Sequence, residues 1–525
     1  MTRREWVVFG VVVAAAGWLR FSALEARSLW FDETLSWRLS GFSWADLVTR
    51  TGERSTVHPP AYFLLLKTWA AVWGDTEVAL RSFSALAGTV AVGSVYFLVR
   101  ELQRFRCAGP VGGVGPLLAA ALMAVSVLQV HVSQNVRGYA LAAAVYIAAG
   151  VAILRALRTG QRRNWIAFAG AALLLVYLHH VAFFHLTALF AFALAYLAWP
   201  PFGAPPTRLQ VRWVLVAGAV VAVGYAPWAS ALFGQVASAR NAWSNGAITA
   251  ETVWVNVPRE TYLALTDSFA VAPSAPSGAA VGVMLALAVG LILLGLWGGW
   301  SGRFLCLIGL VPPLLLLAQS GLGGTRSVYL VRYLALSQLG WLVAAGYAVG
   351  LIRHRADRWA VAGVVMAWGV FFCAQGQETI GPATRPGARE AVAYVQAHRG
   401  AGEVVVARTS FIFYSVDYYS RGDAVRPRLY GTGHDRFLYR NASQLRDSDI
   451  ITPDELRAMN PAGVWFVTTD SYSVGEQFFV PEPEEWVLES VREFPQGDYP
   501  NERPITVEHY VCRTRGTGGA TAGVP

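Results

Sequence analysis

Eleven apolar runs follow one another along the first 377 residues, and each is long enough to suggest a membrane-spanning helix. Such a helix needs about 20 mostly apolar residues. The runs are 6–24, 79–99, 111–129, 139–156, 164–178, 181–199, 212–233, 277–298, 303–320, 330–351 and 359–377. They predict an all-α, polytopic membrane domain of about 11 transmembrane helices over residues 1–377. The first run is long for the apolar part of a signal peptide, so we read it as an uncleaved anchor.

The pattern changes after residue 377. Residues 388–398 and 452–459 have helical periodicity, whereas three runs are rich in β-branched residues and resemble strands, namely 403–408, 463–468 and 504–511. Helices that alternate with strands predict a small α/β domain. We place this domain at 389–515, after a linker at 378–388 that contains glycine and proline, and before a disordered tail at 516–525.

Composition agrees with a membrane protein, because 55% of the 525 residues are hydrophobic and only 14% are charged. Soluble domains average about 25% charged residues. The net charge of +9 comes almost entirely from arginine. No basic run is interleaved with aromatic residues, so nucleic-acid binding is not indicated. The four cysteines form no pattern with metal-ligand spacing, and neither a metal nor another cofactor is indicated.

Arginines in the short connections predict the orientation of the chain. With a cytoplasmic N-terminus, the inner connections contain clusters such as Arg100–Arg106 and Arg155–Arg163, whereas the short outer connections contain few basic residues. The first outer loop, 25–78, is basic, but long loops cross regardless of charge. We therefore expect a multi-pass protein of the inner (plasma) membrane with an extracytoplasmic C-terminal domain.

The outer loop 25–78 is too rich in aromatic residues to be a solvated linker. We expect one or two helices that lie along the membrane interface there. This loop also supplies acidic residues, which are absent from 103–250 and again from 268–356. A site that needs a carboxylate near the membrane must therefore take it from an outer loop.

Asp32 and Glu33 are the sharpest acidic candidates. Apolar and aromatic neighbours such as Trp30 and Phe31 would partly remove the Asp32 carboxylate from water and favour it as a proton acceptor. An equally acceptable interpretation makes Asp32 the N-cap of an interfacial helix. The residues alone leave both interpretations open.

Polar and basic residues at the outer helix ends are candidates for substrate contacts. His58 precedes Pro59–Pro60 and could contact a phosphate or sugar, or merely cap a helix. Arg137 suits a phosphate because its planar guanidinium binds such oxygens in pairs, although a solvated turn would also explain it. The remaining candidates are Gln134, Tyr139, Arg326, Arg332 and Tyr333. His179 and His180 are read as turn histidines.

Several segments resemble one family. They are Ser28–Glu33, His58–Phe63, Glu77–Gly88 with Arg100–Leu102, Ser133–Tyr139 and Val331–Leu334. In order and spacing they are similar to the GT-C glycosyltransferases, and specifically to the bacterial relatives of dolichyl-phosphate-mannose-protein mannosyltransferases (glycosyltransferase family 39). The resemblance covers the first 150 residues in motifs and the remainder in layout.

The resemblance implies a GT-C fold and a membrane glycosyltransferase that inverts the anomeric centre. The donor would be a polyprenyl-phosphate sugar, carrying mannose or another hexose or pentose. The acceptor would be a hydroxyl group on a glycan, a lipid or a protein. Asp32 would be the catalytic base and Glu33 would assist or orient it. The basic residues Arg137, Arg326 or Arg332 would contact the lipid phosphate, and Arg81, inside a shared motif, is a further candidate. His58 replaces a lysine found in some relatives.

Three other readings stay open from the residues alone. The first is a transporter or lipid flippase, which the scarcity of acids within the spans and the absence of a repeat disfavour. The second is a polymerase or ligase of lipid-linked glycans. The third is a non-catalytic scaffold whose C-terminal domain binds a partner.

Overall fold

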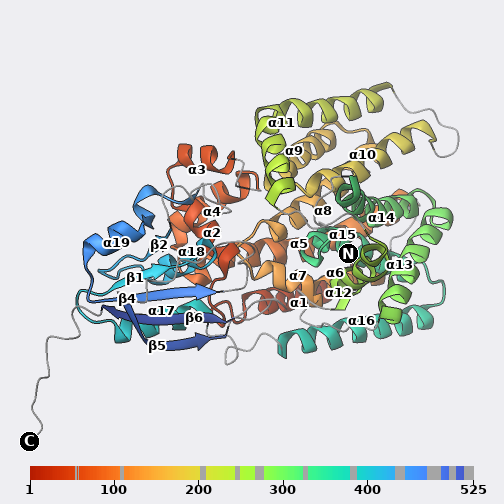
Figure 1. The fold of residues 1–525 in the computed structure, drawn as a ribbon. Coiled ribbons are helices and arrows are strands. Elements are labelled where there is room, and N and C mark those ends of the chain that lie inside the picture. The colour runs from red at the N-terminus through yellow and green to blue at the C-terminus, as the bar shows by residue number, and fades with distance from the viewer. Residues whose placement is uncertain are drawn as a thin grey trace, which may run out of the picture. The chain divides into compact units, whose positions relative to one another are not determined.

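The computed structural model describes residues 1–53, 56, 58–106, 112–200, 208–242, 249–266, 277–322, 329–378, 387–431, 444–469, 486–495 and 504–512. Most of these residues are helical (Figure 1). The chain divides into two compact units. The first contains Met1–Leu24 and Leu47–Thr379, and the second contains Glu25–Asp46 and Ile380–Pro525. Predicted residue Arg326, most of the predicted linker and the predicted tail lie outside the described residues.

The first unit is a bundle of helices that match all eleven apolar runs. The helices are α1 (Arg3–Phe21), α4 (Ala61–Trp73), α5 (Glu77–Arg106), α6 (Val114–Val125), α7 (Val127–Ser133), α8 (Tyr139–Thr159), α9 (Arg162–Leu178), α10 (Ala182–Ala198), α11 (Arg208–Ala242), α12 (Val257–Thr266), α13 (Ser277–Trp297), α14 (Gly299–Leu322), α15 (Val331–Gly350) and α16 (Arg355–Glu378). A short π-helix, Thr252–Asn256, precedes α12.

Seven helices in the described part of the chain are long and apolar enough to cross a membrane, and α6 with α7 makes an eighth if that bent pair is one span. The seven are α5, α8, α11, α13, α14, α15 and α16. The other three predicted runs are α1, α9 and α10, which have 19, 17 and 17 residues. The polytopic, all-α prediction is confirmed, with fewer full-length spans than the eleven expected.

The predicted run 111–129 is not one straight helix. It breaks at Ser126, where α6 and α7 meet at a bend of 60°. A break leaves carbonyl groups without helical partners, and such groups are costly away from water. Arg20 of α1 supplies the donors, with its guanidinium 3.0 Å from the Ala124 carbonyl and 2.9 Å from the Met123 carbonyl. This buried arginine therefore stabilises the bend that leads α7 toward residue 137.

Helices α6 and α15 pack closely through glycine. A Cβ atom at Gly346 would lie 2.6 Å from the Gly115 carbonyl and 2.6 Å from Ala119 Cβ. Small residues allow this backbone approach, which is a common means of helix association in membranes.

We expect Gly346→Ala to lower the stability of the protein by about 1–3 kcal/mol, because the new methyl group would push α6 and α15 apart. The measurement is the thermal midpoint of unfolding of the purified protein in detergent. Gly363→Ala in α16 is the matched control, since a Cβ there meets nothing within 4 Å. Equal midpoints for the two variants would contradict this account of the packing.

The second unit contains one six-stranded sheet in the order β3-β2-β1-β4-β6-β5. The strands are β1 (Val404–Ala407), β2 (Arg428–Tyr430), β3 (Ile450–Ile451), β4 (Gly463–Thr469), β5 (Trp486–Phe494) and β6 (Ile505–Cys512). Strands β3, β2, β1 and β4 are parallel to one another. Strand β6 pairs antiparallel with β4, and β5 pairs antiparallel with β6. The three predicted strand runs became β1, β4 and β6, whereas β2, β3 and β5 were not predicted.

Helices cover both faces of this sheet. On one face, α17 (Gly387–His398) and α18 (Ser410–Tyr419) contribute residues such as Val392 and Phe413 to a core with Trp465 and Val467 of β4. On the other, Leu456 of α19 (Pro453–Met459) packs with Val406 and Phe466. The expected small α/β domain is present, and α17 and α19 match the predicted helices.

The units differ from the predicted domain boundaries at residues 25–46. This segment, with helix α2 (Phe31–Ser40), was assigned to the membrane domain from its position in the chain. The structure places Leu35 of α2 in the core of the second unit, beside α18 and the sheet. The outer loop 25–78 contains three helices, α2, α3 (Trp44–Thr51) and α4, where one or two were expected. Contacts between residues about 380 positions apart decide this assignment, and local periodicity cannot reveal them.

Candidate functional site

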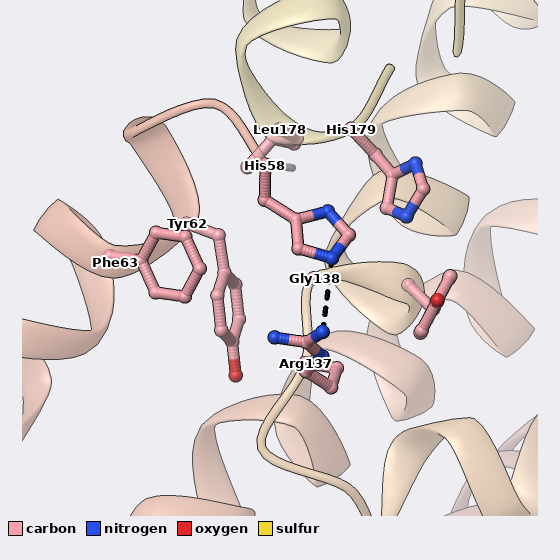
Figure 2. Close-up of a pocket in the computed structure, with 8 residues that line it drawn as sticks. His58, Tyr62, Phe63, Arg137, Gly138, Leu178 and His179 are labelled. Carbon is pink, nitrogen blue, oxygen red and sulfur yellow. Dashed lines mark hydrogen bonds between the residues drawn. The ribbon is translucent and has the colours of Figure 1, made fainter. Parts of the chain in front are cut away.

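A small pocket in the first unit gathers polar side chains from three connections between helices (Figure 2). His58 comes from the segment before α4, Arg137 from the turn between α7 and α8, and His179 from the turn between α9 and α10. The rest of the lining is Tyr62, Phe63, Gly138, Tyr139 and Leu178. Three predicted contact residues, His58, Arg137 and Tyr139, thus lie together.

His58 is held in place by the start of α4. The two prolines that follow it lead into the helix, since Pro60 is the N-cap and α4 begins at Ala61. Its Nε2 atom lies 3.0 Å from the guanidinium of Arg137, as the dashed line in Figure 2 shows. A guanidinium only donates, so Nε2 accepts and the neutral ring carries its proton on Nδ1.

The charge state of His58 follows from its surroundings. Burial, and then the positive charge of Arg137, lower the pKa of His58 well below its ordinary value; His179, His180 and Arg332 act in the same direction. His58 therefore stays neutral near pH 7 and orients Arg137 without competing with it for an anion.

Arg137 lies in a tight turn between two helices. Its backbone N–H donates to the Asn135 carbonyl at 2.8 Å, and its carbonyl accepts from Ser84 of α5 at 3.3 Å. The residue is only 6% exposed. Its guanidinium lines the pocket, where its planar N–H groups suit the oxygens of an anion.

His179 offers a second donor at the same pocket. Its Nδ1 accepts from the Val181 N–H at 3.1 Å, so the neutral ring carries its proton on Nε2. Burial, and then His180, lower the pKa of His179 well below its ordinary value. Nε2 is buried and has no hydrogen-bond partner among the described residues. A buried N–H without a partner costs free energy that a bound acceptor would recover.

Arg332 and Tyr333, at the start of α15, extend this basic region. The ring of Tyr333 lies 6.1 Å from that of His179, and the charge of Arg332 acts on both His58 and His179. Glu260 of α12 contacts the start of α15, where its carboxylate accepts from the Val331 N–H at 2.8 Å. Burial raises the pKa of Glu260, while that hydrogen bond and the nearby arginines lower it in part.

Two further predicted contact residues donate to backbone carbonyls at the end of α1. Arg81 is fully buried and donates to the Leu24 carbonyl at 2.5 Å. The side-chain amide of Gln134 donates to the carbonyls of Leu19 at 2.9 Å and Ser22 at 3.1 Å. Both residues bind the end of α1, and Gln134 thereby anchors the turn that carries Arg137.

Asp32 and Glu33 lie in the first turn of α2, in the second unit. The N-cap of α2 is Trp30, not Asp32, so the alternative that Asp32 caps the helix is wrong. Glu33 does the capping instead, since its buried carboxylate accepts from the Trp30 N–H at 3.3 Å. Asp32 is partly exposed.

The part that His179 plays was not predicted from the sequence. The histidine lies in a turn, as expected, but its ring also completes the pocket. The available signal was its position at a helix end with no acidic residue nearby. No group of three or more His, Cys, Asp or Glu side chains in the described ranges is arranged to bind a metal.

The two neutral histidines predict how stability depends on pH. Their folded pKa values lie below the unfolded value of about 6.5, so unfolding takes up protons below that pH. The contribution of the two histidines to the free energy of unfolding is fully present above about pH 6.5 and is lost as the pH falls below that value. Thermal midpoints between pH 7.5 and 5.0 measure this, and His179→Gln should flatten the slope. Replacing exposed His398 by Gln is the control; an unchanged slope in His179→Gln would contradict the assignment.

This chain is similar to known proteins in two respects, the sequence of one part of it and its fold. Residues 57–230 match the family described as dolichyl-phosphate-mannose-protein mannosyltransferase. The matched range contains His58, Arg137 and His179 and leaves out Asp32 and Arg332. No curated protein sequence matches the chain.

Two solved proteins share the fold of this chain at low sequence identity. ArnT from Cupriavidus metallidurans bound to undecaprenyl phosphate has a TM-score of 0.58 at 12% identity, over 97% of this chain and 98% of that one. Its apo state has a TM-score of 0.55 at 10% identity, over the same shares. The oligosaccharyltransferase of Archaeoglobus fulgidus tethered to an acceptor peptide has a TM-score of 0.51 at 13% identity, over 81% of this chain and 64% of that one.

Proposed function

We propose that this chain is a GT-C glycosyltransferase that transfers a sugar from a polyprenyl-phosphate carrier to an acceptor hydroxyl group. The sugar is mannose or another hexose or pentose, and the acceptor is a glycan, a lipid or a protein. The reaction takes place at the outer face of the inner membrane, with the N-terminus in the cytoplasm. Support for a lipid-phosphate donor includes the undecaprenyl phosphate bound by the similar ArnT structure.

The pocket beside Arg137 is the observation that carries this proposal. It presents a buried guanidinium and the unpartnered Nε2–H of His179, with neutral His58 orienting the guanidinium. Both donors suit phosphate oxygens, and the positive charge of Arg332 reinforces them. The aromatic and apolar lining from Tyr62, Phe63 and Leu178 suits the neighbouring lipid chain.

The chemistry explains why two arginines are useful. A polyprenyl-phosphate sugar is a phosphodiester with one negative charge, and the departing polyprenyl phosphate carries up to two. Negative charge therefore grows on the phosphate as the bond to the anomeric carbon breaks. Arg137 and Arg332 stabilise that growing charge in the transition state more than in the bound donor, which is the condition for a faster reaction.

The acceptor hydroxyl needs a base as it attacks the anomeric carbon from the side opposite the phosphate. We assign this role to Asp32, which accepts the hydroxyl proton as the new bond forms and the bond to the phosphate breaks. This single displacement inverts the anomeric carbon. Glu33 caps the same helix turn and so holds the backbone of Asp32 in position. The leaving phosphate is weakly basic and needs no strong general acid.

A transfer assay with purified protein tests the proposal. Undecaprenyl phosphates labelled in the sugar, including mannose and a pentose, are incubated with the protein and with a cell-envelope extract as acceptor. We expect label to move to the acceptor while free undecaprenyl phosphate appears in equal amount. Movement of intact labelled donor across a liposome membrane, without cleavage, would instead support a flippase and overturn the enzymatic proposal.

A further inference from the structure

We propose that an ion cluster of the second unit, Arg38 with Asp417 and Asp449, is a positioning device for the catalytic carboxylate of Asp32. The inference rests on the proposed function, and it assigns a catalytic purpose to the C-terminal domain. The three residues do not touch substrate in this proposal. They act through helix α2, which carries Arg38 near its end and Asp32 in its first turn.

Helix α2 packs along α18 over its whole length. The ring of Phe31 lies 4.7 Å from that of Phe411, and the ring of Trp37 lies 5.0 Å from that of Tyr418. Between these pairs, Leu35 is buried in the core that α17, α18 and the sheet share. Helix α2 has ten residues, too few to be stable alone, so its conformation depends on this packing.

Polar contacts then fix the helix along and around its axis. The hydroxyl groups of Thr34 and Ser415 lie 3.3 Å apart, and the Leu29 N–H donates to the Tyr419 hydroxyl at 2.5 Å. The Arg38 guanidinium donates to Asp417 at 2.6 Å and also to Asp449. Together these contacts define the rotation of α2 about its own axis and its position along α18.

The ion cluster is the most demanding of these contacts, because it is buried. The side chains of Arg38, Asp417 and Asp449 are 9%, 7% and 13% exposed. Two carboxylates bind different nitrogens of one guanidinium, so both their directions and distances are constrained. Removing the charge of Asp417 takes away one of the two ion pairs that hold Arg38, and removing Arg38 takes away the donor that both carboxylates share; either loss loosens the hold on α2.

The geometry of a helix links this cluster to Asp32. Arg38 follows Asp32 by six positions, which places them about 9 Å apart along the axis and about 120° apart around it. The face with Arg38 is turned into the domain, and Asp32 is partly exposed on another side. A rotation of α2 on α18 would therefore redirect the Asp32 carboxylate, and even a shift of about 1 Å at a reacting group can cost about 10²-fold in rate.

A paired substitution tests the inference. Asp417→Asn keeps the shape of the side chain and removes its charge. Asp423→Asn is the matched control, since Asp423 accepts from Arg399 at 2.9 Å in the same unit and has no role in α2. Three quantities are measured in the full-length protein: kcat and KM for the lipid donor, the hydrogen–deuterium exchange of residues 31–40, and the thermal midpoint.

We expect Asp417→Asn to lower kcat at least tenfold, with KM for the donor changed less than twofold, and to speed exchange in residues 31–40. Asp423→Asn should change neither. Arg38→Lys, which retains one positive charge, should keep more activity than Arg38→Gln. Equal losses of kcat in Asp417→Asn and Asp423→Asn would show a merely structural role, and faster exchange with unchanged kcat would remove the link to catalysis; each overturns the inference.

The exchange measurement separates this inference from the proposed function. If the wild-type protein transfers sugar from none of the labelled donors, the proposed function fails. Exchange in residues 31–40 still decides whether the cluster fixes α2. Unchanged exchange in both Asp417→Asn and Arg38→Gln would overturn the positioning role whatever the activity of the wild type.

Discussion

Asp32→Asn is expected to lower kcat for sugar transfer by about 10²–10⁴-fold, the range that a positioned general base contributes. The amide has nearly the shape of the carboxylate but cannot accept the hydroxyl proton. Donor binding should be unchanged, because the residues assigned to the lipid phosphate lie elsewhere in the chain. Single-turnover transfer measures the rate, and binding of the labelled donor to the variant measures the affinity.

Glu33→Gln is the matched control for this substitution. An amide oxygen can still accept from the Trp30 N–H, so the helix cap persists and we expect a loss of tenfold or less. A variant Asp32→Asn that transfers sugar at the wild-type rate would remove this residue from the role of base. A larger loss in Glu33→Gln than in Asp32→Asn would exchange the roles of the two acids.

Arg137→Leu should lower kcat/KM for the donor by about 10²–10³-fold, as expected when a buried donor to a developing anion is removed. The leucine fills much of the space but cannot bind phosphate oxygens, and it leaves His58 Nε2 without its donor. Arg137→Lys should recover part of the activity, since it restores the charge without the paired geometry. Donor titrations with undecaprenyl phosphate as a competitor provide the measurement.

A second arginine controls for the general effect of losing a positive charge. Arg104 lies about 30 Å along α5 from Ser84, the residue that contacts the Arg137 backbone, and it is half-exposed. Arg104→Leu should leave kcat/KM within twofold of the wild-type value. If undecaprenyl phosphate inhibits Arg137→Leu as strongly as the wild type, the pocket is not the phosphate site.

The helical bundle could be predicted in detail because its signal is local. The run 330–351 became α15 (Val331–Gly350), and 139–156 lies within α8 (Tyr139–Thr159), since apolar length alone specifies a spanning helix. The break at Ser126 escaped prediction for the opposite reason. It is stabilised by Arg20, more than 100 residues away in sequence, which satisfies the carbonyls that the bend releases.

The candidate site was predictable only in part. His58 and Arg137 stood out as polar residues next to proline or at a turn between apolar helices, where any polar group needs a partner. Their hydrogen bond, and the orientation of His58 as acceptor, depend on helices α4 and α8 meeting in space. His179 looked like an ordinary turn residue because its unpartnered Nε2 is visible only once its surroundings are known.

By itself, the order of apolar and polar residues determined that this chain is a polytopic helical protein with a small α/β domain at its C-terminus. It also showed that residues 103–250 and 268–356 contain no acidic residue. The tertiary structure alone decided that α2 belongs with that C-terminal domain and that His58, Arg137 and His179 share one pocket. Periodicity reports the environment of a residue relative to its neighbours in the chain, whereas a site is made by contacts between distant segments, and those contacts exist only after the chain has packed.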